Sequence, residues 1–558
     1  MRTLRAAVTL VVLSLIACAA SSAGPANAGH PCLVAIGVNP QPFNRNFNPF
    51  ASPLDFTWGG IYEPLVVVTQ AGGGHEYLWL ASRLDWSKDG RTLTITVRSG
   101  VRWTDGRPLT AEDVLFTLTA GRRDKAMDQI GLERPGNEVA SVSVVAPDKV
   151  AVRLKHRDST FVARVLANNL FVLPAHVFSR IRHVGGWSNP HPVGTGPFAV
   201  VRSVTDQSFV LSRNPHYWRK GAPHFACIRT VLASSSEAAL MQMVHGDVDL
   251  TDNYVPNVEK AYVSHDPAHF HFFYATTSLP VGLFFDDSKY PYSLVALRKA
   301  ISMAIDRRTL SQFAEYGYAP PVDALGIEHD WANWVDPAIA AQSRRLAAYN
   351  PGGARRLLEA AGFSYAGKTL MDPRGHPVTL DASVIASWTD WVTAWQVVVK
   401  NLAQIGIHVA LDRVPDWGAW QPGAFATKTA TFLWNNFGNG PTPYDYFEQH
   451  LDRASFVPSG KSAEVSGNWE HFWSPEGTRL LRAFRGTTDL TVQHRLAVRL
   501  ERLWLRTLPY VPLFVGPTWS TYSTRHFTGF PNARDYYIQP STFSSDYVVA
   551  LVRIRPVS

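Results

Sequence analysis

Residues 97–114 read VRSGVRWTDGRPLTAEDV, a stretch that predicts the end of a strand, a turn and the start of a helix in close succession. Upstream, polar and apolar side chains alternate over residues 92–98, as they do on a half-buried strand. Asp105-Gly106 is typical of a turn. Thr110 and Asp113 then form a capping box ahead of an apolar run, because these two residues can satisfy backbone N–H groups at a helix start reciprocally.

Strands and helices continue to follow one another downstream of this stretch. A Pro-Asp turn predicts a hairpin between Val142–Val145 and Val150–Leu154. Asp306 is placed to cap a helix, and another helix is expected to begin at Thr389 and to end at Gly406. The pattern predicts an α/β protein with several structural units.

Composition excludes several classes of protein. The chain has 558 residues, of which 46% are hydrophobic and 18% charged, so it is neither disordered nor a disulfide-rich miniprotein. Its formal net charge is +8, but the basic residues are scattered and form no run of the kind that binds nucleic acid. We therefore expect a large globular protein without a nucleic-acid partner.

The N-terminus has the layout of an export signal. Arg2 and Arg5 precede an apolar run over residues 6–17, which is shorter than the ~20 residues that span a bilayer. Cleavage after Ala28 would remove residues 1–28, whereas a lipobox-like sequence ending at Cys18 would leave a lipid anchor. The mature protein is expected in the periplasm or on the outer face of the cytoplasmic membrane.

Cleavage after Ala28 would leave Cys32 and Cys227 as the only cysteines. Disulfides persist in extracytoplasmic compartments, so a bond between these two residues is one hypothesis. The alternative is a pair of unpaired, buried thiols.

The common catalytic and metal-binding motifs are absent or weak. Gly460-Lys461-Ser462 resembles only the end of a phosphate-binding loop. The histidines at 265, 269 and 271 could chelate a metal, but polar positions on a loop and a strand edge explain them as well. The carboxylate pairs Asp286-Asp287 and Asp247 with Asp249 fit a turn and a strand edge. We therefore expect no catalytic residue, metal or cofactor.

Aromatic and amide side chains gather in the second half of the chain. Rings supply apolar contact and amides both donate and accept hydrogen bonds, which suits reversible capture of a polar solute. A single Trp is more often part of the core. The Gly, Pro and Asn content of residues 433–446 nevertheless predicts an exposed loop. The candidate ligand-binding residues are Trp388, Trp417, Trp434, Asn435, Asn436, Asn439, Tyr444 and Asp445.

Several segments together resemble the family 5 solute-binding proteins of ATP-dependent (ABC) importers, which include dipeptide-, oligopeptide-, nickel- and some oligosaccharide-binding proteins. The resemblance spans nearly the whole mature chain. The strongest segments are VRSGVRWTDG (97–106), LTAEDV (109–114), VGTGPF (193–198) and LSRNPHYW (211–218). Weaker segments are LRKAISMAIDR (297–307), ARRLLEAAG (354–362), LAQIGIHV (402–409) and LPYVPL (508–513).

The resemblance implies a two-lobed periplasmic-binding-protein-like fold (type II, cluster C) that closes on ligand by hinge motion. Lobe I would combine residues 29–62, 186–270 and 506–558, with an inserted subdomain at 63–185. Lobe II would be residues 271–505. The closed, monomeric protein would then present its ligand to the transmembrane subunits of an ABC permease.

The ligand class stays open at this point. In peptide-binding members an acidic residue in the loop that matches 433–446 pairs with the peptide's α-amino group, whereas this loop has Asn435, Asn436 and Asn439, with Asp445 as its only carboxylate. Trp434 with its neighbouring amides is similar to oligosaccharide-binding members. We favour a peptide ligand. The alternatives are an oligosaccharide, nickel or a nickel chelate, and a secreted hydrolase of another class.

Overall fold

The structure is a computed structural model. It describes residues 32–37, 42–51, 54–69, 75–132, 137–167, 170–327, 329–425, 431–435, 440–463 and 467–557. The expected signal sequence, including Cys18, lies outside the described residues.

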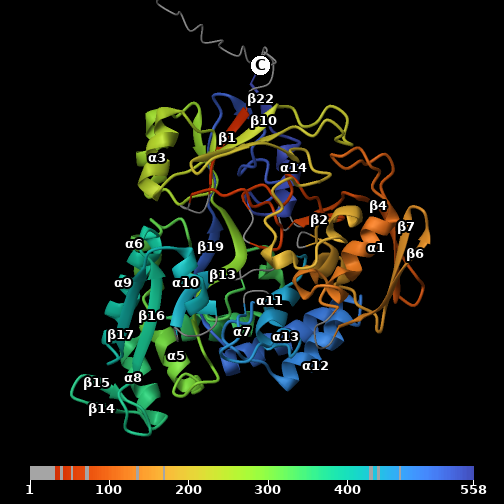
Figure 1. Cartoon of the computed structure of the whole chain (residues 1–558). Helices are drawn as coiled ribbons and strands as arrows, with labels where there is room; N and C mark the ends of the chain where they lie inside the picture. The colour runs from red at the N-terminus through yellow and green to blue at the C-terminus, as the bar shows by residue number, and fades with distance from the viewer. Residues whose placement is uncertain are drawn as a thin grey trace, which may run out of the picture.

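A seven-stranded sheet forms the upper part of the molecule in Figure 1, with the strand order β12-β20-β11-β1-β10-β9-β8. β1 runs parallel to β10 on one side and to β11 on the other, and the remaining pairs are antiparallel. The strands are β1 (Cys32–Ile36), β8 (Val200–Val204), β9 (Ser208–Ser212), β10 (Cys227–Val231), β11 (Leu250–Thr251), β12 (Phe270–Phe272) and β20 (Thr521–Ser523).

A five-stranded sheet, ordered β17-β16-β18-β13-β19, forms the centre of a second unit. β16 is parallel to β17 and to β18, and β13 is antiparallel to β18 and β19. The strands are β13 (Ala275–Phe285), β16 (Thr379–Ile385), β17 (His408–Val414), β18 (Thr431–Asn435) and β19 (Val511–Thr518).

The stretch at 97–114 folds as the sequence predicts. β5 (Thr92–Val97) buries its alternate apolar side chains, and α1 (Ala111–Thr119) follows with a capping box. The Thr110 backbone N–H donates to the Asp113 carboxylate over 3.0 Å. The predicted hairpin is also confirmed, as β6 (Val139–Ala146) and β7 (Lys149–Leu154), and β4 (Ala81–Trp86) completes an antiparallel sheet ordered β4-β5-β7-β6.

Helices cover the five-stranded sheet, and two arginines of the 297–307 segment tie the last strand to them. Arg298, on α5 (Val295–Ala304), pairs with Asp287 at 3.1 Å and donates to the Leu508 carbonyl. Arg307, at the start of α6 (Arg307–Ala314), donates to the Pro512 carbonyl at 2.9 Å. Asp306 caps α6 through the Thr309 backbone N–H, as predicted.

The remaining elements complete the two lobes. α9 (Thr389–Ala403) is the predicted helix, and Gly406 after it has a φ of 79°, which suits glycine. Other helices are α2 (Ala175–Phe178), α3 (Ser236–His245), α4 (Val258–Ala261), α7 (Pro337–Ala347), α8 (Pro351–Ala360), α10 (Trp417–Phe425), α11 (Tyr444–Leu451), α12 (Pro475–Arg485), α13 (Leu490–Thr507) and α14 (Val548–Leu551). Short two-stranded sheets pair β2 (Val66–Thr69) with β3 (His75–Leu78), β14 (Ser364–Ala366) with β15 (Thr369–Met371), and β21 (Phe527–Thr528) with β22 (Arg555–Pro556).

The molecule therefore has two lobes, each built on one large sheet, and the boundary near the C-terminus differs from the expected one. Residues 506–558 were expected in lobe I, but β19 pairs with β13 in the five-stranded sheet of lobe II. The chain returns to the seven-stranded sheet only at β20, because the local sequence of a strand does not reveal which sheet it joins. The other expected boundaries stay predictions.

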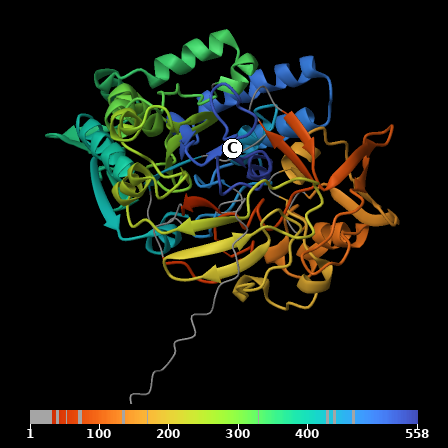
Figure 2. The same ribbon diagram turned by 90° about the horizontal axis from the view of Figure 1, so that it is seen from above.

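The four-stranded sheet lies on the opposite side of the molecule from β16 and β17, as both views show (Figures 1 and 2). Residues next to the four-stranded sheet also contact lobe II. The Arg485 guanidinium at the end of α12 pairs with Glu138 at 2.5 Å, and the Ser159 backbone N–H donates to the Arg485 carbonyl. This unit is thus held against helices of lobe II. No helix in the described ranges is both long and apolar enough to cross a membrane.

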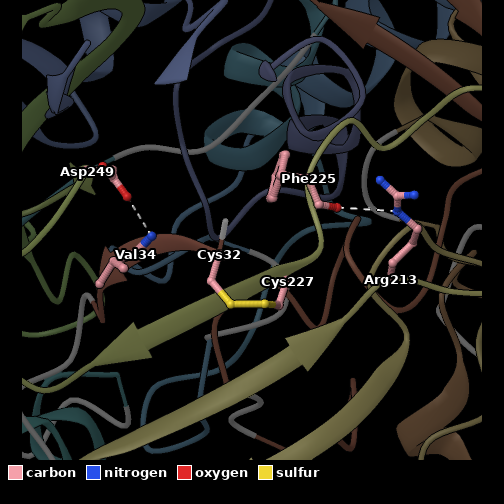
Figure 3. The surroundings of a disulfide bond; sticks show 6 residues. All are labelled: Cys32, Val34, Arg213, Phe225, Cys227 and Asp249. Atoms are coloured by element: carbon pink, nitrogen blue, oxygen red, sulfur yellow. Dashed lines mark hydrogen bonds between the residues drawn. A yellow bond between two sulfur atoms is a disulfide. The ribbon is translucent and has the colours of Figure 1, made fainter. Parts of the chain in front are cut away.

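Cys32 and Cys227 lie at the first positions of β1 and β10 and are directly paired in the parallel ladder. Their Cα atoms are 4.4 Å apart, and the sulfurs are bonded (Figure 3). Next to them, the Val34 backbone N–H donates to Asp249 at 2.9 Å. The bond would therefore fasten the N-terminal strand into the sheet of lobe I.

Candidate functional site

The two lobes are joined by a pair of adjacent chain crossings. β12 and β20 pair in the upper sheet, while β13 and β19, which follow and precede them, pair in the lower sheet. Between these pairs the Phe273 backbone N–H donates to the Ser520 carbonyl over 2.8 Å. The crossings thus form a two-stranded connection, which we call the hinge ribbon (residues 273–274 and 519–520).

Aromatic side chains bring the two lobes together beside the hinge ribbon. Tyr254 follows β11 of lobe I, and its hydroxyl donates to the carbonyl of Ala314, at the end of α6 in lobe II, over 2.8 Å. The Trp519 ring lies 5.0 Å from the ring of Tyr254 and 4.6 Å from that of Tyr274. We call the arrangement of Tyr254, Tyr274, Ala314 and Trp519 the interlobe junction, because it brings residues of both lobes into contact.

Lobe II carries a cluster of five indole rings next to the start of α9. Trp434 on β18 is at its centre, with ring centroids 5.0 Å from Trp420 and 5.3 Å from Trp417. Trp434 is 9% exposed and Trp420 is 2% exposed, whereas the outer members are half-buried. The tryptophan cluster consists of Trp388, Trp391, Trp417, Trp420 and Trp434.

The expected exposed loop at 433–446 is wrong at both ends. Trp434 belongs to strand β18, where it packs in the core, and Tyr444 begins helix α11 with its side chain buried. Pairing with β13 draws Trp434 into the sheet despite the Gly, Pro and Asn residues that follow it. Asn435 is the last residue of β18, and Asn436 and Asn439 lie outside the described residues.

Asp445, in the first turn of α11, is half-buried and lies near the guanidinium of Arg164. Burial works against the charge of Arg164, but the nearby groups of Asp158, Tyr444 and Glu448, and to a smaller extent Asp445, raise the pKa of Arg164 above its ordinary value. The Arg164 guanidinium also pairs directly with Asp158 at 2.8 Å. The charge of Asp445 therefore already acts on a basic side chain of this protein.

Three buried carboxyl groups near the interlobe junction are absent from the sequence predictions. Asp252 precedes Tyr254, and burial raises the pKa of its carboxyl to about 7 although the Thr542 hydroxyl and backbone N–H donate to it. Glu315 follows α6 and Asp390 lies in the first turn of α9. No local motif distinguishes these residues, and only the tertiary structure brings them to the junction.

The carboxylates and histidines considered as catalytic or metal-binding groups have structural partners. Asp286 accepts a hydrogen bond from Ser288, and Asp249 accepts one from the Val34 backbone N–H. His269 contacts Asp266, and His271 contacts Thr524. Within the described residues no group of three or more His, Cys, Asp or Glu side chains is arranged to hold a metal ion.

The family model of the bacterial extracellular solute-binding proteins, family 5, matches residues 77–456. This range covers most of the chain and includes both the four-stranded sheet and the tryptophan cluster. The chain belongs to family 5. This family consists of the extracytoplasmic solute-binding components of ABC importers, and its members are binding proteins and not enzymes.

Individual relatives of this family 5 protein differ in what they bind. The nickel-binding periplasmic protein of Escherichia coli is 26% identical over 72% of this chain and 74% of its own length. A putative ABC transporter peptide-binding protein of Brucella ovis is 28% identical over 62% of this chain, which spans 64% of that relative, just under two thirds. A periplasmic oligopeptide-binding protein of Thermotoga maritima, solved with mannohexaose bound, has a TM-score of 0.84 with 22% identity and covers 94% of this chain and 98% of its own. That likeness shows the fold alone.

Proposed function

We propose that this family 5 protein captures peptides between its two lobes and delivers them to the permease of an ABC importer. The interlobe junction is the observation that carries the proposal. Tyr254 of lobe I and Ala314 of lobe II are joined by a hydrogen bond beside the hinge ribbon, so polar groups from both lobes converge where a ligand would be enclosed. A ligand that contacts both lobes would bias an equilibrium between open and closed forms.

The names of the Brucella relatives support a peptide ligand. A peptide backbone presents regularly spaced donors and acceptors, and buried polar groups at the junction would pair with them. The tryptophan cluster would contribute apolar contact to peptide side chains through its half-buried members, Trp388 and Trp417.

A second candidate ligand is an oligosaccharide, which the same half-buried indole rings favour. The flat apolar faces of sugars stack on tryptophan, and neighbouring amide and hydroxyl groups can bind the sugar hydroxyls. The Thermotoga maritima neighbour was solved with a mannohexaose bound. Nickel or a nickel chelate would instead follow the Escherichia coli relative.

Native mass spectrometry of the purified protein, before and after mild denaturation, would distinguish these ligands. Released masses that form a ladder of amino-acid residues are the expected result. A ladder spaced by one hexose would replace the peptide with the oligosaccharide, and a single metal-containing species would indicate nickel. A protein that converts added peptide into fragments instead of returning it intact would contradict a binding function.

A further inference from the structure

Two carboxyl groups of lobe II are buried together at the interlobe junction. Glu315 is the C-cap residue that directly follows α6, and Asp390 lies in the first turn of α9, which packs against α6. Glu315 is 1% exposed and Asp390 is 6% exposed. The charge of Asp390 acts directly on the carboxyl of Glu315. We call these two residues the acidic pair.

The acidic pair lacks a basic partner among the described residues. Neither carboxylate forms an ion pair with Lys, Arg or His, and Glu315 Oε2 is buried without any hydrogen-bond donor. Asp287, another buried carboxylate of lobe II, does have such a partner, because it pairs with the Arg298 guanidinium. A buried carboxylate without a counter-charge is strongly destabilised, so the pair must hold protons or receive a cation.

While no ligand is bound, protonation can neutralise the negative charge of the acidic pair. Burial raises the pKa of Asp390 to about 7, and burial together with the charge of Asp390 raises the pKa of Glu315 well above its ordinary value. The titratable groups that act on one another here are tyrosines: Tyr254 from lobe I, Tyr274 from the hinge ribbon, and Tyr316 and Tyr318 after α6. None of these groups supplies a positive charge.

The surroundings of the pair are suited to a cation. Aromatic ring faces attract positive charge. Tyr254 lies near both carboxyls and Tyr274 near Glu315, and the Trp519 ring packs against both tyrosine rings. The hydroxyl of Tyr254, a residue of lobe I, donates a hydrogen bond to the carbonyl of Ala314, the residue before Glu315. A lobe I side chain thus covers this part of lobe II. A positively charged group placed there before closure would be enclosed by both lobes.

We propose that the acidic pair, Glu315 and Asp390, is the subsite for a cationic group of the ligand, either an ammonium or a guanidinium. This inference rests on the proposed function, since it assigns a chemical class to the peptide captured between the lobes. The charge balance is a simple exchange: the cationic group enters, and a proton held by the pair leaves to the solvent.

Three tripeptides separate the possible sources of the cation. N-acetyl-Ala-norleucine-Ala carries no cationic group, Ala-norleucine-Ala carries only an α-ammonium, and N-acetyl-Ala-Lys-Ala carries only a side-chain ammonium. Titration calorimetry of the full mature protein at pH 7, in two buffers of different ionisation enthalpy, gives both affinity and proton release. We expect at least one cationic peptide to bind about tenfold or more tighter than the uncharged peptide, with release of a proton.

Isosteric variants test the residues themselves. Glu315→Gln and Asp390→Asn should each remove most of the preference for the cationic peptide and most of the proton release. Each variant keeps the shape of the side chain, and its melting temperature reports whether the fold is retained. Glu501→Gln is the matched control, because Glu501 is a fully buried carboxyl with a raised pKa on α13 and should leave both readouts unchanged.

The possible failures are distinguishable. Equal affinity for all three peptides, or unaltered preference in both acidic-pair variants, would overturn the subsite and leave peptide capture standing. If none of the three peptides bound to the wild-type protein, peptide capture and the subsite would both be rejected. Preference for the α-ammonium or for the lysine peptide, lost in the variants, would support the subsite and identify the source of the cation.

Discussion

Two tryptophans of the same cluster are expected to respond differently to truncation. Trp434 lies in the core of lobe II, so Trp434→Ala should lower the free energy of unfolding by about 3–5 kcal/mol. Trp417 is half-buried at the outside of the cluster, so Trp417→Ala should cost less than about 2 kcal/mol. If the cluster contributes to the ligand site, Trp417→Ala should also lose the ligand that wild-type protein retains.

Urea unfolding measures the first effect and native mass spectrometry the second. The pair serves as its own control, because both changes remove the same side chain. A Trp434→Ala protein as stable as the wild type would show that the central ring is not part of the core. Full retention of ligand by Trp417→Ala would remove the cluster from the proposed site.

At the scale of single elements, the start of α1 depends on one carboxylate. Asp113 is buried, accepts hydrogen bonds from the backbone N–H groups of Thr110 and Ala175, and so joins two helices. Asp113→Ala would leave both donors without this acceptor and should destabilise the protein by about 2–3 kcal/mol. Glu112→Ala, on the exposed side of the same turn, should change stability by less than about 0.5 kcal/mol. If the two variants had the same urea midpoint, Asp113 would not have this role in stabilising the start of α1.

The same element shows what sequence can predict. The strand, turn and cap at 92–114 follow rules that act within a few residues, and the structure confirms all three. Trp434 was expected in a loop because Gly, Pro and Asn follow it, but pairing with β13, about 150 positions earlier, decides its place. Glu315 and Asp390 have no local signal, since only the packing of α6 against α9 brings them together. Local rules thus predicted elements, while the members of the candidate site depend on long-range contacts.

For the whole molecule, buried carboxyls predict that stability falls as pH rises toward neutrality. Burial raises the pKa of Glu501 to about 7, so between its unfolded value and pH 7 the folded state holds a proton that the unfolded chain has released. Stability from this group is therefore complete at low pH and is lost as pH rises through 7. Asp252 and Asp390 act in the same direction. His450 has the opposite effect and adds stability as pH rises, because burial lowers its pKa to about 3 and the unfolded chain binds the proton more readily.

Glu501→Gln should reduce the fall in unfolding free energy between pH 5 and pH 8 by about 1–3 kcal/mol. Urea unfolding at the two pH values measures the difference. Glu476→Gln provides the control, because Glu476 pairs with Arg506 at the surface of the protein. The assignment fails if Glu501→Gln and wild type lose stability equally over this range.

The bond between Cys32 and Cys227 should be present in mature protein purified without reductant. Intact mass should rise by ~2 Da on reduction, and Cys32→Ser with Cys227→Ser should lower the free energy of unfolding by about 2–4 kcal/mol, since the bond restricts the unfolded chain. The control is the same double variant measured with reductant, which should match the reduced wild-type protein. An unchanged mass on reduction would show that the thiols are unpaired.

That bond also makes a covalent ring of residues 32–227, which include the whole four-stranded sheet, because its two cysteines are 195 positions apart in the chain. A protease that cuts one peptide bond anywhere inside this ring opens it but releases nothing. The two pieces would migrate as one band on a non-reducing gel and separate only after reduction. A single cut beyond Cys227 would divide the molecule at once. A cut in the four-stranded sheet outside the cell would therefore leave the N-terminal strand, and any lipid attached ahead of it, connected to the rest of the protein.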